Sequence, residues 1–248
     1  MAIMVDKKPG YKGEALVWES LSMNLPNDVV VYNTREIVDD REFDFALLIK
    51  GLGVLVIEVK GWEAKYIFEV SNVDTIVMVN DPKIYHSPEK QARSYRFDWR
   101  NYLDNEFSVH PLVFSMVCYP FISEQEFYEK GLDIVSKSEF TLFAEDIKNP
   151  AKLSKKIINL FSKKKSLYSD EMDDKLINMI RKKLEPQFKN NSIAKETIEN
   201  PYSVLKIYKG RVSHGEMDML VKNYFSGVKT ICFFKEPMDL ENVAYRLN

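Results

Sequence analysis

The sequence predicts an α/β fold, in which helices cover both faces of a buried sheet. Two neighbouring segments, 43–49 and 54–59, carry apolar residues on both of their alternating sides, as strands do when neither face meets water. Patterns with helical periodicity lie on either side of them, over residues 13–25 and 88–103. Alternation of buried strands with helices is typical of layered α/β domains.

The first helical pattern carries an acidic residue on its apolar side. Trp18, Leu21 and Leu25 share one stripe, and Glu14 lies four residues before Trp18 on the same stripe. A solvated acid that interacts with the helix dipole explains Glu14 in isolation. An inward glutamate that takes part in a site is the alternative, and both interpretations stay open at this point.

The two central strands form a predicted hairpin with charged residues near its open end. A turn of odd length through Gly51, Leu52 and Gly53 keeps Asp44 and Glu58 on the same side of the sheet. Burial of an unpaired carboxylate is costly, so buried acids are paired, protonated or bound to a metal. These acids therefore indicate chemistry.

Further elements complete the first 150 residues. Ser87 followed by Pro88 is a typical helix start, because serine caps the first turn and proline suits its first position. We predict additional strands over residues 29–33, 65–70, 75–80 and 112–121, and an edge strand that runs into a loop over residues 139–147.

The character of the chain changes near residue 150. Residues 1–150 contain 16 basic and 25 acidic side chains, whereas residues 151–199 contain 12 and 7. We predict two domains, 1–148 and 149–248. The second domain begins with basic helices over 151–165 and 170–185. It ends with a small α/β part, in which we predict a strand-like segment over 201–209, a strand over 228–234 and a helix over 239–248. It ends without a helix stop signal, as the front part of a longer polypeptide would.

Composition places the protein in the cytoplasm. No apolar run is long enough to span a bilayer, and the first residues lack the apolar core of a signal peptide. The two cysteines, Cys118 and Cys232, each lie within an apolar run, as buried reduced thiols do. The cysteines and the three histidines are far apart in sequence, which argues against a zinc site.

The acids of the hairpin are spaced for metal-dependent phosphodiester hydrolysis. Asp44 and Glu58 on neighbouring strands supply the oxygen ligands that Mg²⁺ prefers, with Mn²⁺ as the expected substitute, and the carbonyl of Val59 offers a further ligand. Lys60 shares the face of Glu58, and its ammonium can orient the attacking water or stabilise the transition state. Glu14, if it points inward, completes the acidic cluster and is a further predicted metal ligand.

Four segments together resemble a known family. Gly13-Glu14, 42-EFDFALL-48, 57-IEVKGW-62 and 91-QARSY-95 are similar in type and order to the nuclease-related domain (NERD), a branch of the PD-(D/E)XK restriction-endonuclease-like superfamily. The resemblance covers roughly residues 10–122. It implies a restriction-endonuclease-like core with a mixed central sheet flanked by helices, and it places Glu14, Asp44, Glu58 and Lys60 at active-site positions.

Three more residues belong to the predicted site. The resemblance matches Gln91 and Tyr95 to a Q-x-x-x-Y element that lies beside the catalytic centre, although an amide and a phenol four residues apart can also simply bind each other. Glu42 shares the face of Asp44 and is a supporting acid, unless Arg41 or Arg35 pairs with it.

The sequence therefore predicts a Mg²⁺-dependent endonuclease that acts on DNA, with RNA not excluded, in DNA repair or in defence against foreign DNA. Its acidic first domain needs a phosphate-binding surface from elsewhere, and we predict one in the second domain. Its residues are Lys155, Lys156, Lys163, Lys164 and Lys165. A helicase-type partner or a homodimer is expected from the resemblance, and no P-loop motif occurs in these residues. Two alternatives remain: a nucleic-acid-binding accessory module that does not cleave, and a protein-interaction scaffold with a vestigial pocket.

Overall fold

The computed structural model describes residues 1–36, 41–72, 74–79, 81–162 and 169–185. The chain divides into two compact units, Met1–Ile177 and Asn178–Asn248. The first unit holds the sheets and most helices. The predicted elements at 201–209, 228–234 and 239–248 lie outside the described residues, and so does Cys232. The predicted domain boundary at residue 148 stays a prediction.

A mixed six-stranded sheet forms the centre of the first unit. Its strands, in spatial order, are β1 (Ile3–Met4), β2 (Val29–Glu36), β3 (Glu42–Ile49), β4 (Gly53–Val59), β8 (Val113–Cys118) and β9 (Thr141–Leu142). Strands β2, β3 and β4 are antiparallel neighbours, whereas β1 pairs with β2, and β8 with β4 and β9, in parallel. The predicted α/β class and mixed central sheet are confirmed.

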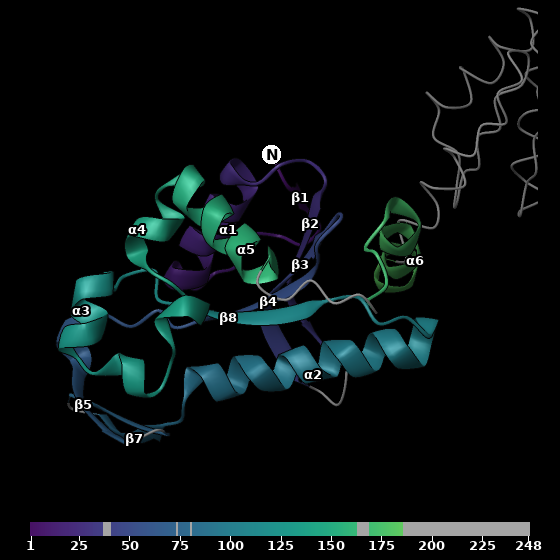
Figure 1. Ribbon diagram of the computed structural model, residues 1–248. Coiled ribbons are helices and arrows are strands. Elements are labelled where there is room, and N and C mark those ends of the chain that lie inside the picture. Colours follow the sequence, from purple (N-terminus) through teal and green to yellow (C-terminus); the bar gives the residue numbers. More distant parts are fainter. Residues whose placement is uncertain (37–40, 73, 80, 163–168, 186–248) are drawn as a thin grey trace, which may run out of the picture. The chain divides into compact units, whose positions relative to one another are not determined.

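Helices cover the sheet on both sides. Their bounds are α1 (Lys12–Asn24), α2 (Pro88–Phe107), α3 (Glu124–Glu129), α4 (Ala144–Ile147), α5 (Pro150–Ser162) and α6 (Asp174–Leu184), with single 3₁₀ turns η1 (Ala64–Tyr66), η2 (Leu132–Ile134) and η3 (Ser138–Phe140). Figure 1 shows α1, α4 and α5 on one side of β4 and β8 and the long α2 on the other. No helix among the described residues has both the length and the apolar character that a bilayer span requires.

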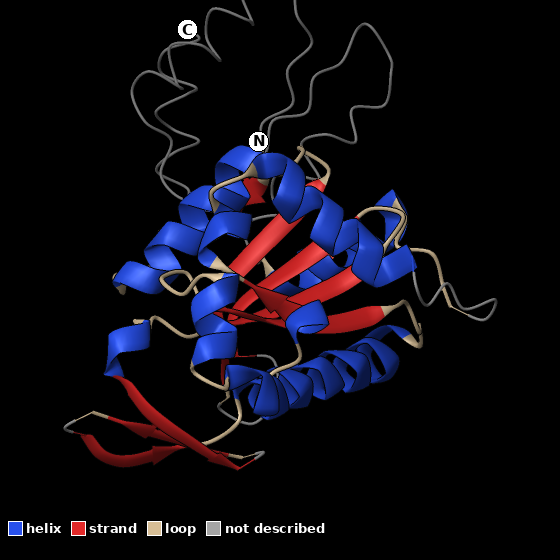
Figure 2. Ribbon diagram, turned by 60° about the vertical axis from the view of Figure 1, so that its left-hand side comes forward, coloured by secondary structure: helices blue, strands red, loops and turns tan. Residues whose placement is uncertain are grey.

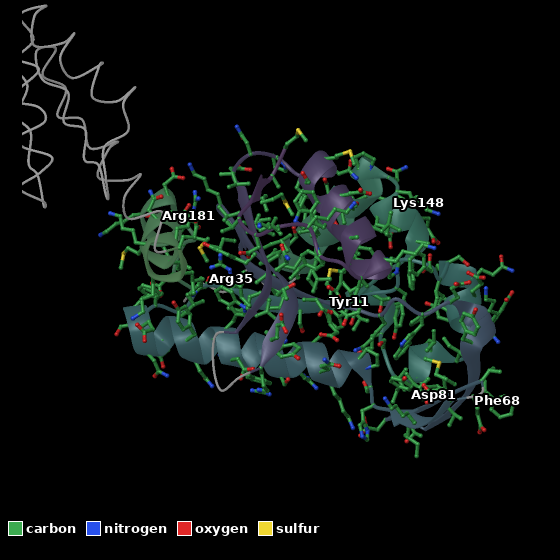
Figure 3. The ribbon with its side chains drawn as sticks, turned by 180° about the vertical axis from the view of Figure 1, so that it is seen from behind. Tyr11, Arg35, Phe68, Asp81, Lys148 and Arg181 are labelled. Atoms are coloured by element: carbon green, nitrogen blue, oxygen red, sulfur yellow. The ribbon has the colours of Figure 1, made fainter. Side chains whose placement is uncertain are left out.

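A second, three-stranded sheet lies away from the central one. Its strands are β5 (Ile67–Asn72), β6 (Thr75–Met78) and β7 (Asp81–Tyr85), all antiparallel. Figure 2 shows it as a separate ribbon beyond the helices, and Figure 3 shows Phe68 and Asp81 on it. The first two strands are close to those predicted. The third was not predicted, because it begins with Asp-Pro, two residues that strands usually avoid.

The turn between β3 and β4 differs slightly from the predicted one. Ile49 pairs with Gly53, so the three-residue loop is Lys50, Gly51 and Leu52. Gly51 has a φ of 72° and Gly53 a φ of 144°, values that side chains other than glycine rarely adopt. The loop still has three residues, and for this reason the predicted side of each following residue is correct.

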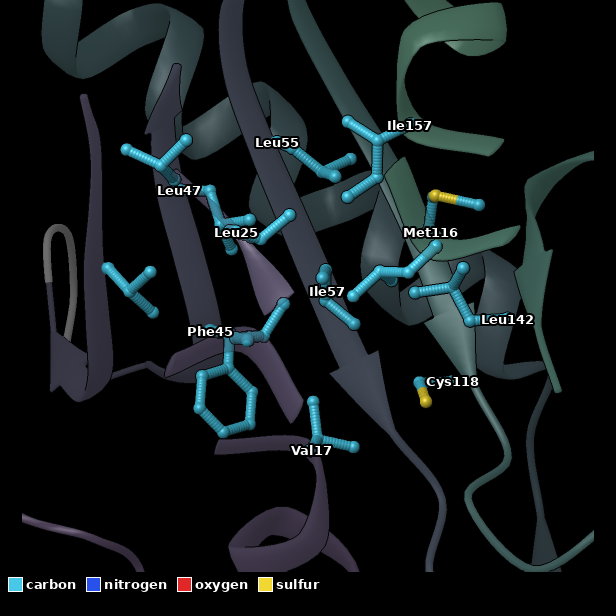
Figure 4. Packing of buried hydrophobic residues seen from close by; sticks show 14 of the residues in the cluster. Val17, Leu25, Phe45, Leu47, Leu55, Ile57, Met116, Cys118, Leu142 and Ile157 are labelled. Carbon is cyan, nitrogen blue, oxygen red and sulfur yellow. The ribbon is translucent and has the colours of Figure 1, made fainter. Parts of the chain in front are cut away.

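The core explains why β3 and β4 are apolar on both sides. Every residue of β4 is buried, and Figure 4 shows Leu55 and Ile57 packed among side chains from α1, β3, β8 and α5. On the opposite face, Trp99 of α2 contacts Phe43 of β3, with ring centroids 5.8 Å apart. Each fully buried large apolar side chain contributes about 1.5–3 kcal/mol, so these two layers fix the hairpin between them.

Helix α2 begins where the sequence predicts. The hydroxyl of Ser87 accepts a hydrogen bond from the backbone N–H of Lys90, and Pro88 occupies the first turn. The helix continues to Phe107, four residues beyond the predicted end, and stops at Ser108, whose φ is 53°. Its length carries it across the sheet beneath both β4 and β8.

The end of the first unit differs from the prediction. Residues 139–147 contain the predicted edge strand only as the two-residue β9, preceded by part of η3, and the short helix α4 follows it where a loop was predicted. Helix α3 was also missed, although Ser123 and Glu126 form a capping box, which is a helix-start signal that the sequence does contain. The helices predicted at 151–165 and 170–185 correspond to α5 and α6.

Candidate functional site

The register of the hairpin brings Asp44 and Glu58 together. Phe45 pairs with Ile57, and continuing this antiparallel register by one residue places Asp44 opposite Glu58. The backbone N–H of Val59 donates a 2.6 Å hydrogen bond to Oδ2 of Asp44, which ties the carboxylate to the neighbouring strand. The two predicted acids therefore lie side by side on one face of the sheet.

A glycine contact brings the start of α1 to the same place. A Cβ atom added to Gly13 would lie 2.9 Å from the Cα of Gly61 and 3.3 Å from Pro120. Only glycine at position 13 permits this approach, because 2.9 Å is shorter than real Cβ contacts. Glu14 follows directly and is half-buried near Asp44, whose charge acts on it. The inward interpretation of Glu14 is thus the one that the structure supports.

Lys60 is held at two points inside the cluster. Its Nζ lies 2.6 Å from Oε1 of Glu58 and 2.9 Å from Oε1 of Gln91 on α2. The amide of Gln91 in turn donates to the hydroxyl of Tyr95 at 3.3 Å. Gln91 and Tyr95 thus bind each other, and Gln91 also binds the lysine, whereas their role beside a catalytic centre stays a prediction.

Trp62 is a member of the site that the sequence analysis did not identify. The ammonium of Lys60 lies 5.8 Å from the centre of its ring, within cation–π range. The ring also packs against Tyr85 of β7 and Tyr119. The tryptophan two residues after the lysine, in 57-IEVKGW-62, was the available signal.

Burial makes the acidic cluster hard to ionise. It raises the pKa of Glu58 to about 7, with the charge of Asp44 adding to the rise and the Lys60 ammonium opposing it. Burial, followed by the charges of Asp44 and Glu42, raises the pKa of Glu14 to about 7. The pKa of Asp44 also rises through burial, against the opposing hydrogen bond from Val59. Three carboxyl groups thus face a single ammonium, and a cation would relieve their repulsion.

The oxygen atoms present suit a hard divalent cation. Glu58 is 3% exposed, and its Oε2 is buried with no hydrogen-bond partner among the described residues. An unpaired buried carboxylate oxygen is costly, and Mg²⁺ is a partner for such an atom. No group of three His, Cys, Asp or Glu side chains in the described part of the chain is close enough to hold a metal ion. A cation here would therefore have Asp44 and Glu58 as its side-chain ligands, without Glu14 as a third, and would take the rest from backbone, water or substrate, as Mg²⁺ commonly does.

The predicted supporting acid, Glu42, lies near the other acids of the site. Glu42 is exposed and acts on Glu14 and Asp44 through its charge, while Arg41 pairs with Asp98 and Arg35 with Asp6, each at 2.6 Å.

Of the predicted phosphate-binding lysines, Lys155 is exposed on α5. Lys156 instead forms an ion pair with Asp146 at 2.6 Å and lies over the ring of Phe143, so its ammonium is already engaged. Lys163, Lys164 and Lys165 lie outside the described residues.

Part of the chain is similar to a known protein family. Residues 9–120 match the family model of the nuclease-related domain. No curated protein and no solved structure matches the chain. The nuclease-related domain belongs to the restriction-endonuclease-like superfamily, so the resemblance in the sequence is confirmed. The match includes α1, the hairpin and α2, the three elements that supply the site.

Proposed function

We propose that the protein is a Mg²⁺-dependent nuclease that hydrolyses phosphodiester bonds in DNA. The family indicates a function related to nucleases. The observation that supports cleavage most directly is the arrangement of Glu58: one oxygen binds the Lys60 ammonium at 2.6 Å, and the other is buried near Asp44 with no partner among the described residues. In a pocket that binds no ligand, this buried oxygen would stay unpaired at a cost in stability.

In the proposed reaction, Asp44 and Glu58 hold the cation, with Glu14 completing the acidic cluster. When bound, the cation neutralises charge on the phosphate and lowers the pKa of a water molecule. Lys60, oriented by Glu58 and Gln91, keeps an N–H for the attacking water or a phosphate oxygen. Water adds to phosphorus, the bond to the leaving oxygen breaks, and a phosphomonoester and a hydroxyl end result.

A cleavage assay tests this proposal. Purified protein is incubated with plasmid DNA and Mg²⁺ or Mn²⁺, next to Asp44→Ala, Glu58→Ala and Lys60→Ala. Lys65→Ala is the matched control, because Lys65 is an exposed lysine that pairs with Glu63 outside the site. We expect each site variant to lose about 100-fold or more of the rate and the control to retain it. Equal cleavage by wild type and all variants would assign the activity to another site or a contaminant.

Two other functions give different results in the same assay. A nucleic-acid-binding accessory module binds DNA or RNA but leaves it intact with either metal, and a protein-interaction scaffold does neither. A role in DNA repair or in defence against foreign DNA, with a helicase-type partner or as a homodimer, is part of the proposal and rests on the resemblance. We also propose that Lys155 contributes to phosphate binding, which Lys155→Glu should weaken in a salt-dependent manner.

A further inference from the structure

Three arginines form a row on a part of α2 that the candidate site does not use. Arg93, Arg96 and Arg100 are spaced at i, i+3 and i+7 and therefore share one face. At 100° per residue, Arg96 lies about 140° around the helix from Gln91. The row thus belongs to a different flank of α2 from Gln91 and Tyr95.

Two cavities adjoin this row. One of about 560 Å³ is lined by Arg93 and Arg96 together with Phe114 and Ser115 of β8. The other, of about 440 Å³, is lined by Arg96 and Arg100 and also by Phe114. Because Arg96 and Phe114 line both, the cavities are neighbours. Each volume lies within the range of small-molecule binding sites, about 300–1,000 Å³.

The cavities lie along an open part of the sheet edge. Strand β9 pairs with β8 only from Val117 onward, so within the described residues no strand covers β8 at Phe114 and Ser115 on that side. Helix α5 closes the larger cavity through Asn159 and Leu160. A concave site with a strand edge as its floor offers backbone groups to a polar ligand.

None of the three guanidinium groups has an acidic partner. Among the described residues they make no ion pair or hydrogen bond, and the Nε of Arg96 is buried without a partner. The guanidinium groups of Arg96 and Arg100 lie over the ring of Phe97, 5.1 and 6.0 Å from its centre. Elsewhere in the unit, Arg41 has an acid at 2.6 Å. A buried donor without a partner is costly, and an anionic ligand would supply one.

The charges around the cavities are predominantly positive. Within the described part of the chain no acidic residue lines the smaller cavity, although His110 on its wall lies beside Asp104 and Asp170. Glu89 and Glu139 line the larger one, where Glu89 is occupied by the backbone N–H of Lys137 at 2.7 Å. Desolvation, followed by the charges of Arg93 and Arg100, lowers the pKa of Arg96. The three cations therefore repel one another in the ligand-free protein.

We propose that Arg93, Arg96 and Arg100 bind a small molecule that carries two or more phosphate groups. Guanidinium groups bind phosphate oxygens through paired N–H donors, and this geometry makes arginine the preferred residue for such groups. Successive members of the row are about 4.5 and 6 Å apart along the helix, so one ligand can contact more than one of them. This site is independent of the proposed cleavage site on the other flank.

Calorimetric titration of the full chain with pyrophosphate tests the proposal. EDTA in the buffer removes divalent cations, so that the candidate nuclease site contributes no binding. We expect saturable binding by the wild type, and at least tenfold weaker binding by Arg93→Gln, Arg96→Gln and Arg100→Gln. Lys152→Gln, which removes an exposed lysine of α5 that lines neither cavity, should bind like the wild type.

The outcomes separate this site from the nuclease proposal. Asp44→Ala should bind pyrophosphate normally even if it cannot cleave DNA. Absence of saturable binding at millimolar pyrophosphate would overturn the inference, as would arginine variants that bind like Lys152→Gln. Arginine-dependent binding of a 5′-phosphorylated oligonucleotide without binding of pyrophosphate would also overturn it, because it would assign the row to nucleic acid. If Arg96→Gln unfolds by circular dichroism, the exposed positions Arg93 and Arg100 provide the test.

Discussion

At the scale of single residues, the site depends on how its carboxyl groups ionise. Burial gives Glu58 and Glu14 pKa values of about 7, so both groups change charge near neutral pH. A cation binds the ionised form, and a proton competes with it below the pKa. The occupancy of the proposed cation site would therefore depend on pH.

The affinity for Mn²⁺ should accordingly rise between pH 6 and pH 8. At pH 6 only about one tenth of a group with a pKa of 7 is ionised. Protonation of each carboxyl ligand with such a pKa therefore makes the affinity at pH 6 about tenfold weaker than at pH 8. Titration calorimetry at the two pH values measures the difference. Glu63→Gln, an exposed acid outside the cluster, should show the same slope as the wild type. An affinity that does not change with pH would contradict the ionisation argument.

At the scale of elements, the approach of α1 to β4 positions Glu14. The two glycines at this contact are not equivalent. A Cβ on Gly13 would lie 2.9 Å from backbone, whereas the nearest atom to a Cβ on Gly61 would be 3.7 Å away, an ordinary contact.

Gly13→Ala should therefore displace α1 from β4 and destabilise the protein by about 1–3 kcal/mol, despite the better helix propensity of alanine. Gly61→Ala is the matched control and should cost much less. Urea unfolding of both variants measures the effect, and cleavage activity should fall with Gly13→Ala alone. Equal stability of the two variants would show that the contact does not constrain the helix.

The contact of α5 with α4 depends on a partly buried ion pair. Oδ2 of Asp146 accepts hydrogen bonds from the Lys156 ammonium at 2.6 Å and from the backbone N–H of Phe143 at 2.9 Å. Without the ammonium, the carboxylate of Asp146 is left buried and uncompensated.

We expect Lys156→Met to lower the free energy of unfolding by about 3 kcal/mol, while Lys155→Met, one residue away and exposed, should leave it nearly unchanged. Chemical denaturation distinguishes the two. If both substitutions are neutral, Lys156 is a free surface lysine, and its predicted role in phosphate binding becomes open again.

At the scale of the whole molecule, the sequence was sufficient for the parts that local rules determine. The hairpin, the start of α2 at Ser87 and the shared side of Asp44 and Glu58 follow from apolar alternation, helix capping and a three-residue turn. The third strand of the smaller sheet and the ion pair of Lys156 with Asp146 depend on tertiary packing, which no local pattern records. The role of Gly13 was not predicted, because it depends on a contact with Gly61, far along the chain, whereas the signal for Trp62 was local and was overlooked.

The whole molecule should also become more stable when a cation binds. The folded-state pKa values of Glu58 and Glu14 lie above the ordinary 4.5, so the folded state holds more protons, and its stability falls as the pH rises from about 4.5 to 7. Mn²⁺ at 100 times its Kd should restore about 2.7 kcal/mol at pH 8. Denaturation with and without Mn²⁺ measures this, and Asp44→Ala should show no gain. An equal gain in the variant would place the cation elsewhere.

The most direct test of the account is a crystal structure of the protein grown with Mn²⁺ at pH 8, with the ion located by its anomalous scattering. The account predicts a peak about 2.0–2.4 Å from Oε2 of Glu58 and from a carboxylate oxygen of Asp44, with Lys60 still held by Gln91. A map without a peak at this position, or with the only peak away from both acids, would contradict the claim that these residues form a cation-dependent nuclease site.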